Sequence, residues 1–337
     1  MNKIKIFCPA TIANLSCGFD VLGTCLENIG DEMIIRKSSE KGIRITKIVG
    51  ANLPLETEKN VAGVAGLALL KAIKFVNNIY VPIEIDIDID IDIEIGFEIE
   101  IYKNIKAGSG IGSSAASAAG AVFGINELLG KPFSRKELVQ FAMQGEVLAS
   151  GSAHADNVAP CLLGGFTLVR NTNPLDIIRI ESPSELYATV IHPHIELKTS
   201  DMRAVLQPMI SLKSAIAQWG NVGALVSGLH TSDYELIGRS LHDEIVEPLR
   251  GKFIPYFNEI KEIALKNGAL GSGISGSGPS IFALSKGKEN AQNVANAMKS
   301  IFVKSRFEFD IYVSKINSNG VAIIWHEFHE LPRINLW

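Results

Sequence analysis

The alternation of apolar and polar positions is strongest in the first hundred residues. Lys3 to Phe7 alternates and predicts a first strand, which the Cys8-Pro9-Ala10 segment ends. From Ile83 to Ile101 every odd position is Ile or Phe, and every even position except Gly96 is Asp or Glu. This period of two predicts a strand with one buried face and one solvated face. Because the run is long for a single strand, we expect a bend or bulge at Gly96.

The acidic face of that predicted strand has two interpretations. Its carboxylates could bind cations. The interpretation we favour is a solvated face whose charges discourage edge-to-edge association.

Helical spacing of apolar residues is clear elsewhere in the chain. It predicts helices over residues 60–76 and 113–129, the second rich in alanine. Ser134 and Glu137 form a capping box that begins a further helix, ending near Ala149. Beyond these, we predict strands over 166–169, 186–191 and 280–284, and helices over 200–210, 215–229, 254–266 and 289–300. A polar stretch with prolines over 171–184 predicts a boundary between two domains, residues 1–175 and 176–330.

Composition narrows the class of protein. With 337 residues, 47% hydrophobic and 20% charged, the chain can bury a large core, and its length favours two domains. The net charge of −4 and the pI near 6.0 argue against a nucleic-acid binder. We find no apolar run long enough to span a membrane and no secretory signal. The four cysteines form no C-x-x-C pair, so we expect reduced thiols and a cytoplasmic location.

A glycine-rich segment before the alanine-rich helix is the first candidate for chemistry. Three glycines in five residues let the backbone turn tightly and expose amides that bind anions. The positive end of the following helix would point at the same place, and two serines could add hydroxyls to a phosphate or Mg²⁺. We therefore predict a phosphate cradle, with a flexible turn as the alternative. No lysine follows the glycines, which excludes a Walker A loop. The candidate residues are Lys106, Ala107, Gly108, Ser109, Gly110, Ile111, Gly112, Ser113, Ser114, Ala115 and Ala116.

Two further segments carry weaker signals. Residues 271–280 contain G-x-G-x-x-G, but a predicted helix precedes them and a strand follows, the reverse of a dinucleotide site. We expect this segment to be a connector that packs against another loop. The segment from Pro9 to Asp20 offers Asn14 for hydrogen bonds and the Asp20 carboxylate for an ammonium or hydroxyl. Ordinary turn chemistry by Asn and Asp is the alternative.

Taken together and in this order, the three segments resemble those of the GHMP kinases, from Pro9 to about Leu284. The resemblance implies a two-domain α+β fold, with an N-terminal α/β domain like domain 2 of ribosomal protein S5 and a C-terminal ferredoxin-like domain. Additional segments are similar to the branch of that family that phosphorylates homoserine. They are Gln144-Gly145-Glu146, residues 154–160, residues 164–167 and Glu247-Pro248-Leu249-Arg250.

This resemblance implies an activity. The chain would use ATP and Mg²⁺ to phosphorylate the side-chain hydroxyl of L-homoserine, a step of threonine biosynthesis. Two alternatives stay open, namely a GHMP kinase acting on another small alcohol and a non-catalytic relative that binds a nucleotide or ligand. The partner is a small molecule rather than nucleic acid or membrane, and a homodimer is left open.

The resemblance also implies roles for individual residues. The segment from Lys106 to Ala116 would wrap the phosphates of ATP, while Ser114 and Glu146 would hold Mg²⁺. The amino-acid substrate would lie among Asn14, Asp20, His154, Arg203 and Arg250, whose two arginines suit a carboxylate. Asn157 would stabilise the transferring phosphoryl group, because phosphoryl transfer depends mainly on positioning and charge. Asp156 is the second choice, as a proton acceptor.

Two histidine pairs look like metal motifs but are incomplete. His326 and His329 are three residues apart, one fewer than in H-E-x-x-H. His192 and His194 have no further ligand nearby in the sequence. We expect neither pair to bind a metal.

Overall fold

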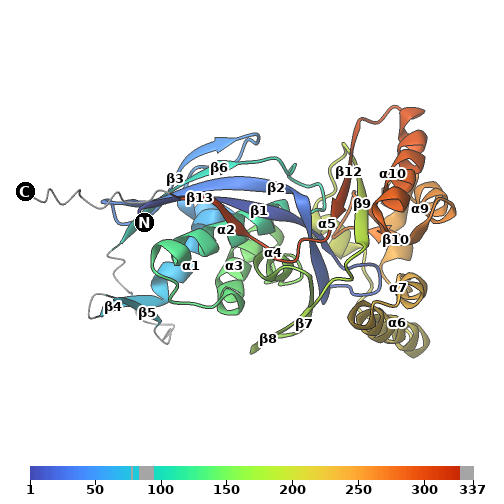
Figure 1. Cartoon of the computed structure of the whole chain (residues 1–337), viewed down its shortest axis with the longest axis horizontal. Helices are drawn as coiled ribbons and strands as arrows, with labels where there is room; N and C mark the ends of the chain where they lie inside the picture. Colours follow the sequence, from blue (N-terminus) through green and yellow to red (C-terminus); the bar gives the residue numbers. More distant parts are fainter. Residues whose placement is uncertain (77–78, 83–94, 327–337) are drawn as a thin grey trace, which may run out of the picture.

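A computed structural model describes residues 1–76, 79–82 and 95–326 of the chain (Figure 1). Its larger sheet has seven strands in the order β13-β1-β2-β6-β3, with β7 added to β2 and β8 added to β7. All neighbours in this sheet are antiparallel except β3 and β6. The strands are β1 (Lys3–Ala13), β2 (Leu22–Ser38), β3 (Gly42–Val49), β6 (Gly96–Tyr102), β7 (Phe166–Thr172), β8 (Leu175–Ile180) and β13 (Ala322–His326).

Helices α1, α2 and α4 pack on one face of this sheet, and α3 packs on these helices (Figure 1). The central one, α2, can approach the sheet closely because it is built of small residues. A Cβ at Gly120 would lie 2.4 Å from Cys8 Sγ and from Met33 Sδ. The middle of α2 thereby packs directly against β1 and β2. The helices are α1 (Val61–Lys71), α2 (Ser113–Leu128), α3 (Arg135–Ser150) and α4 (Val158–Leu163), and a hairpin of β4 (Ile73–Val76) and β5 (Ile79–Pro82) follows α1.

A second, antiparallel sheet forms the other half of the molecule, in the order β10-β11-β9-β12. Helices α9 and α10 pack on the side of this sheet that faces away from the first half (Figure 1). The strands are β9 (Leu186–Pro193), β10 (Ala269–Ile274), β11 (Ile281–Lys286) and β12 (Phe309–Lys315). The helices are α5 (Thr199–Ala204), α6 (Leu212–Thr231), α7 (Tyr234–Ser240), α8 (Glu247–Arg250), α9 (Phe257–Lys266) and α10 (Lys288–Val303), with 3₁₀ turns at Thr57–Lys59 and Gly251–Phe253. Within the described ranges, no helix is long and apolar enough to cross a membrane.

Several predicted elements have different limits in the structure. β1 does not stop at Pro9 but continues to Ala13, because a shift of register between Pro9 and Thr11 absorbs the missing proline N–H. The helix predicted over 60–76 ends at Lys71, and the chain turns into β4. The helix predicted over 200–210 is only α5, and the first residues of the 271–280 segment belong to β10.

The acidic strand is described only in its last part. There β6 buries Phe97, Ile99 and Ile101, and its carboxylates Glu98 and Glu100 form ion pairs with Arg36 on β2. In this part the acidic face therefore pairs with cationic side chains of the same sheet. Residues 83–94, which carry most of the predicted acidic face, lie outside the described residues.

The strand pairings of the first sheet can be compared with the predicted domain limits. β8 pairs with β7, and β13 pairs with β1, so residues up to Ile180 and the strand from Ala322 belong to the first sheet. The division into residues 1–175 and 176–330 stays a prediction.

Candidate active site

A cavity of about 540 Å³ collects residues from both halves of the chain. Its lining contains all the predicted site residues except Lys106, Ile111, Ala115 and Ala116. The glycine-rich segment and Glu146 contribute to it from the first half, and Arg203 and Arg250 contribute from the second. Residues that are more than two hundred positions apart in sequence thus border one space.

The glycine-rich segment leads directly into α2. Gly108, Gly110 and Gly112 have φ values of 70°, 81° and 73°, a region that L side chains rarely adopt. None of the described side chains caps the N-terminus of α2, so its first amides are left for an anion. Gly110 also packs against the second glycine-rich segment, since its carbonyl accepts a hydrogen bond of 2.8 Å from Ser275 Oγ. The predicted role of that segment as a connector packed on another loop is confirmed.

A substitution in this turn tests its role. A Cβ at Gly110 would lie 2.5 Å from the Gly278 carbonyl oxygen, so Gly110→Ala must displace the loop. We expect the KM for ATP to rise about 30-fold, a loss of roughly 2 kcal/mol of binding. Gly130→Ala is the matched control, because Gly130 has a similar φ of 88° but open space around its Cβ. An unchanged KM in Gly110→Ala would exclude this turn from nucleotide binding.

Glu146 is the one acid of α3 that is buried, and its Oε1 has no hydrogen-bond partner among the residues that the structure describes. Burial raises the pKa of this carboxyl to about 7, against smaller lowering effects of the Ser114 hydroxyl and the Lys103 charge. A buried, unpaired carboxylate oxygen is costly unless something binds it. A carboxylate next to a serine hydroxyl suits a hard cation such as Mg²⁺, which takes one or two protein oxygens besides phosphates. The pair Ser114 and Glu146 therefore fits the metal site expected from the sequence.

Lys103 holds the start of α2 and was not singled out in the sequence. Its ammonium is ion-paired with Asp31 and donates to Ser113 O at 2.7 Å and to Ser117 Oγ at 3.1 Å. Asp31 in turn accepts the backbone N–H of Ile105 at 2.9 Å. The side chains of Lys103 and Asp31 are both buried. Their hydrogen bonds therefore fix the residues on either side of the glycine-rich segment. The sequence offers only a lysine directly after a buried strand, which is a weak signal.

Arg203 and Asp20 form the centre of the predicted amino-acid pocket. One guanidinium nitrogen of Arg203 lies 2.7 Å and 2.9 Å from the two Asp20 carboxylate oxygens, and 3.4 Å from His154 Nδ1. Arg203 Nε is buried and has no hydrogen-bond partner within the described part of the chain. Asn14 fixes the loop, since it accepts the Asp20 N–H at 3.0 Å and donates to Gly276 O at 2.7 Å. Burial lowers the pKa of His154.

Arg250 is almost completely buried beneath this pocket. Its Nε donates to Met202 O at 2.9 Å and a second nitrogen donates to Gly276 O at 3.3 Å. The guanidinium groups of Arg203 and Arg250 lie 5.4 Å and 5.1 Å from the ring centroid of Phe19. Burial, followed by the Arg203 charge, lowers the pKa of Arg250 to about 10, so it stays cationic at neutral pH. Two cationic groups therefore border the cavity at the end occupied by Asp20.

Asp156 and Asn157 lie at the N-terminal end of α4 and both border the cavity. Thr11 Oγ1 donates a hydrogen bond of 2.6 Å to Asn157 Oδ1, which leaves the amide N–H groups of Asn157 for other acceptors. Asp156 is buried, and burial, then repulsion by Asp20 and Glu146, raises its pKa to about 7. Thr11 is a further residue that the sequence did not identify.

A glycine-rich turn at a helix N-terminus and two arginines border one cavity, and proteins of similar sequence define the class to which this chain belongs. Residues 68–165 match the family model of the GHMP kinases N terminal domain, and residues 225–304 match that of the GHMP kinases C terminal domain. The chain belongs to the GHMP kinases, and within them to the homoserine kinase family. Its two-domain α+β fold is thereby confirmed.

The similarity to homoserine kinases extends over nearly the whole chain. The homoserine kinase of Chlorobium phaeobacteroides strain BS1 is 48% identical over 96% of this chain and 100% of its own length. That of Methanococcus vannielii is 38% identical over 90% of this chain and 94% of its own. The crystal structure of homoserine kinase from Cytophaga hutchinsonii has 50% identity and a TM-score of 0.87, covering 96% of this chain and 98% of that one. Mevalonate kinase from L. major, at 16% identity, a TM-score of 0.67 and coverage of 93% and 96%, shares the fold.

Proposed function

We propose that this chain transfers the γ-phosphoryl group of ATP to the side-chain hydroxyl of L-homoserine and releases ADP and O-phospho-L-homoserine, a step of threonine biosynthesis. The hydroxyl oxygen forms a bond to the γ-phosphorus as the bond to the β-γ bridging oxygen breaks, and the hydroxyl proton is released. The observation that carries the proposal is the buried, unpaired Nε of Arg203 beside Asp20, in the same cavity as the glycine-rich turn.

The nucleotide end of the cavity would be formed by the turn and α2. Backbone amides from Ala107 to Ser114 would bind the phosphates, assisted by the positive end of the helix. Ser114 and Glu146 would hold Mg²⁺, which neutralises charge on the β- and γ-phosphates. The Lys103 network supports these residues by fixing the first turn of α2.

At the amino-acid end of the cavity, the charged side chains are complementary to the two charges of a zwitterionic amino acid. Arg203 Nε, which no described residue pairs, would bind a substrate carboxylate, and Arg250 adds a second cation nearby. The Asp20 carboxylate, held by Arg203 in this structure, supplies the negative charge for an ammonium. A mevalonate-type alcohol lacks the ammonium, and galactose lacks both charged groups, so neither uses the whole set.

An ADP-release assay across L-homoserine, L-serine, L-threonine, mevalonate and galactose tests this proposal. We expect kcat/KM for homoserine to exceed that of every other alcohol by at least about 100-fold, close to 3 kcal/mol of discrimination. A higher value for mevalonate would assign a different GHMP substrate. Nucleotide binding without turnover of any alcohol would instead identify a non-catalytic relative.

The Thr11–Asn157 hydrogen bond gives a smaller, local prediction. Thr11→Val removes the donor that orients the Asn157 amide, and we expect kcat to fall about 10-fold with KM values unchanged, a cost of roughly 1.4 kcal/mol. Thr189→Val is a matched control, because the buried Thr189 also donates one hydrogen bond, to Ala291 O, but lies outside the cavity lining. If both variants lose stability equally and neither loses kcat, Thr11 has only a structural role.

Kinetics of two variants can distinguish phosphoryl stabilisation by Asn157 from proton abstraction by Asp156. We expect Asn157→Ala to lower kcat about 100-fold, whereas Asp156→Asn lowers it only a few-fold, because charge stabilisation outweighs proton abstraction in this reaction. A basic role for Asp156 would reverse this order. In that case the fall of kcat below about pH 7 would also be steeper in the natural protein than in Asp156→Asn, in which only Glu146, with the same pKa of about 7, still titrates. The kcat values from pH 6 to 9 of the three proteins decide the matter.

A further inference from the structure

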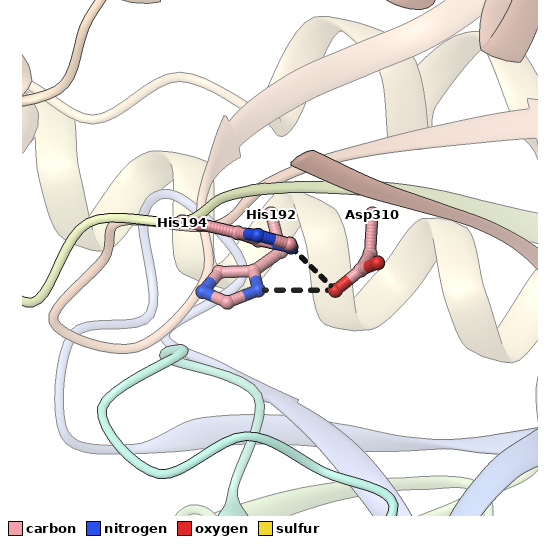
Figure 2. Close-up of side chains that lie close together, drawn as sticks. All are labelled: His192, His194 and Asp310. Carbon is pink, nitrogen blue, oxygen red and sulfur yellow. Dashed lines mark hydrogen bonds and ion pairs between the residues drawn. The ribbon is translucent and has the colours of Figure 1, made fainter. Parts of the chain in front are cut away.

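Three side chains with metal-binding atoms gather at one end of the second sheet (Figure 2). His192 lies at the end of β9, and His194 follows two residues later on the same side. Asp310 lies on β12, directly opposite His192 in the antiparallel register. Pairing of the two strands therefore places the aspartate beside both imidazoles. No further candidate ligand lies near this histidine pair in the sequence, and the third group, Asp310, comes from a strand more than a hundred residues later.

The distances suit a small cation. His194 Nε2 lies 2.8 Å from Asp310 Oδ2, His192 Nδ1 lies 3.8 Å from the same oxygen, and all three atoms are within 4.8 Å of one another. Ligands at 2.0–2.1 Å from a tetrahedral zinc ion are separated by about 3.3 Å, so only small rotations are needed. Because two of the ligands lie within paired strands, the backbone already holds this geometry.

The surroundings of the cluster hold the two imidazole rings in place. His192 is 3% exposed, so its ring is fixed by the packing around it. Glu308 Oε2 lies 3.4 Å from His194 Nδ1, the ring nitrogen that does not face Asp310. A carboxylate on the outer nitrogen of a ligating histidine is a common support of metal sites, because it fixes the ring and its tautomer.

A cation already lies against these atoms. The Lys106 ammonium is 2.7 Å from His194 Nε2 and 3.0 Å from Asp310 Oδ2. The two potential ligand atoms thus share one positive group, as they would share a metal ion. Lys106 is 50% exposed on a flexible stem, so it can move away at little cost.

We propose that His192, His194 and Asp310 form a binding site for a divalent transition-metal ion of the zinc type, which takes the place of the Lys106 ammonium. Two nitrogen ligands and one carboxylate favour Zn²⁺, Co²⁺ or Ni²⁺ over Mg²⁺. Three protein ligands leave a fourth position for water. This site is separate from the magnesium site at Glu146, and none of its three ligands lines the active-site cavity.

Cobalt titration of the full-length protein, freed of metal by a chelator, tests the site. Tetrahedral Co²⁺ has an intense visible absorption, and we expect one equivalent to bind with a Kd of about 10 µM or tighter and to be displaced by Zn²⁺. His194→Ala and Asp310→Asn should each weaken binding at least about 10-fold, while kcat with MgATP is unchanged. Lys106→Met should tighten binding several-fold, because it removes the competing cation. His242→Ala, which removes an exposed histidine outside the cluster, should bind as the natural protein does.

The outcomes separate clearly. Absence of the absorption band, or a band that survives in the His194→Ala and Asp310→Asn variants, would overturn the proposal. Loss of the band in His242→Ala would assign the binding to an adventitious surface histidine. An unchanged affinity in Lys106→Met would contradict replacement of the ammonium. Circular dichroism of each variant confirms that it is folded, and the result does not depend on which alcohol the enzyme phosphorylates.

Discussion

Glu146→Gln is expected to lower kcat at least about 1,000-fold while making the protein more stable at alkaline pH. The loss of roughly 4 kcal/mol in the transition state follows if the carboxylate holds the cation that neutralises the transferring phosphates. Glutamine has the same shape but no charge, so the fold around it need not change. The gain in stability follows because the folded protein keeps this carboxyl buried, with one oxygen unpaired.

The pH dependence of this stability effect has a defined sign. The pKa of Glu146 is about 7 in the folded protein, above its ordinary value of 4.5, so unfolding releases a proton between these two pH values. The free energy of unfolding of the natural protein therefore decreases as the pH rises from 4.5 to 7, and this contribution is fully lost above pH 7. Glutamine does not titrate. Without Mg²⁺, the variant should match the natural protein near pH 4.5 and exceed it by about 3 kcal/mol at pH 8.

Denaturant unfolding at pH 5 and pH 8, together with steady-state kinetics, checks both parts of this prediction. Glu262→Gln is the control, because it makes the same substitution at an exposed site on α9 that forms an ion pair with Lys266. It should change neither kcat nor, by more than about 0.5 kcal/mol, stability. A Glu146→Gln variant with normal kcat would remove Glu146 from the metal site. A variant that is inactive but destabilised at pH 8 would show that Glu146 supports the fold instead.

The parts of the site that could be predicted from the sequence are those that local sequence patterns determine. Glycines at alternate positions before an alanine-rich run define a turn and a helix start, and both are found where expected. The Ser134–Glu137 capping box is also present, with both of its hydrogen bonds. Such features depend on backbone sterics and on neighbours a few residues away. The roles of Glu146 and Arg203 came instead from resemblance, because nothing near them in sequence indicates burial next to the cavity.

Pairs that meet only in the folded chain were missed. Lys103 and Asp31 are 72 residues apart, and Thr11 and Asn157 are 146 apart, yet each pair forms a hydrogen bond in the structure. Asp310 reaches the two histidines of β9 only through the register of two strands. Period-2 and period-3.6 patterns say which face of an element is buried, but not which element packs there. The predicted end of the first strand at Pro9 is wrong for a related reason. Pairing with β2 overrides the local preference of proline, and the strand continues.

Arg203→Ala is expected to lower kcat/KM for homoserine about 1,000-fold, almost entirely through a higher KM for homoserine. Truncation removes the free Nε available to a substrate carboxylate and also leaves Asp20 without its partner, which together are worth about 4 kcal/mol. The KM for ATP should change less than about 3-fold, because none of the hydrogen bonds of Arg203 reaches the glycine-rich turn.

Arg203→Lys distinguishes charge from geometry at this position. Lysine keeps one positive charge but cannot offer two parallel N–H groups, so it cannot contact Asp20 and a carboxylate as the guanidinium does. We expect an intermediate loss of about 100-fold in kcat/KM, or close to 3 kcal/mol. Arg239→Ala, at an exposed position on α7 outside the cavity, serves as the control and should leave both KM values unchanged. If the homoserine KM stays constant in Arg203→Ala while the KM for ATP rises, the carboxylate clamp is wrongly assigned, and the guanidinium serves the nucleotide instead.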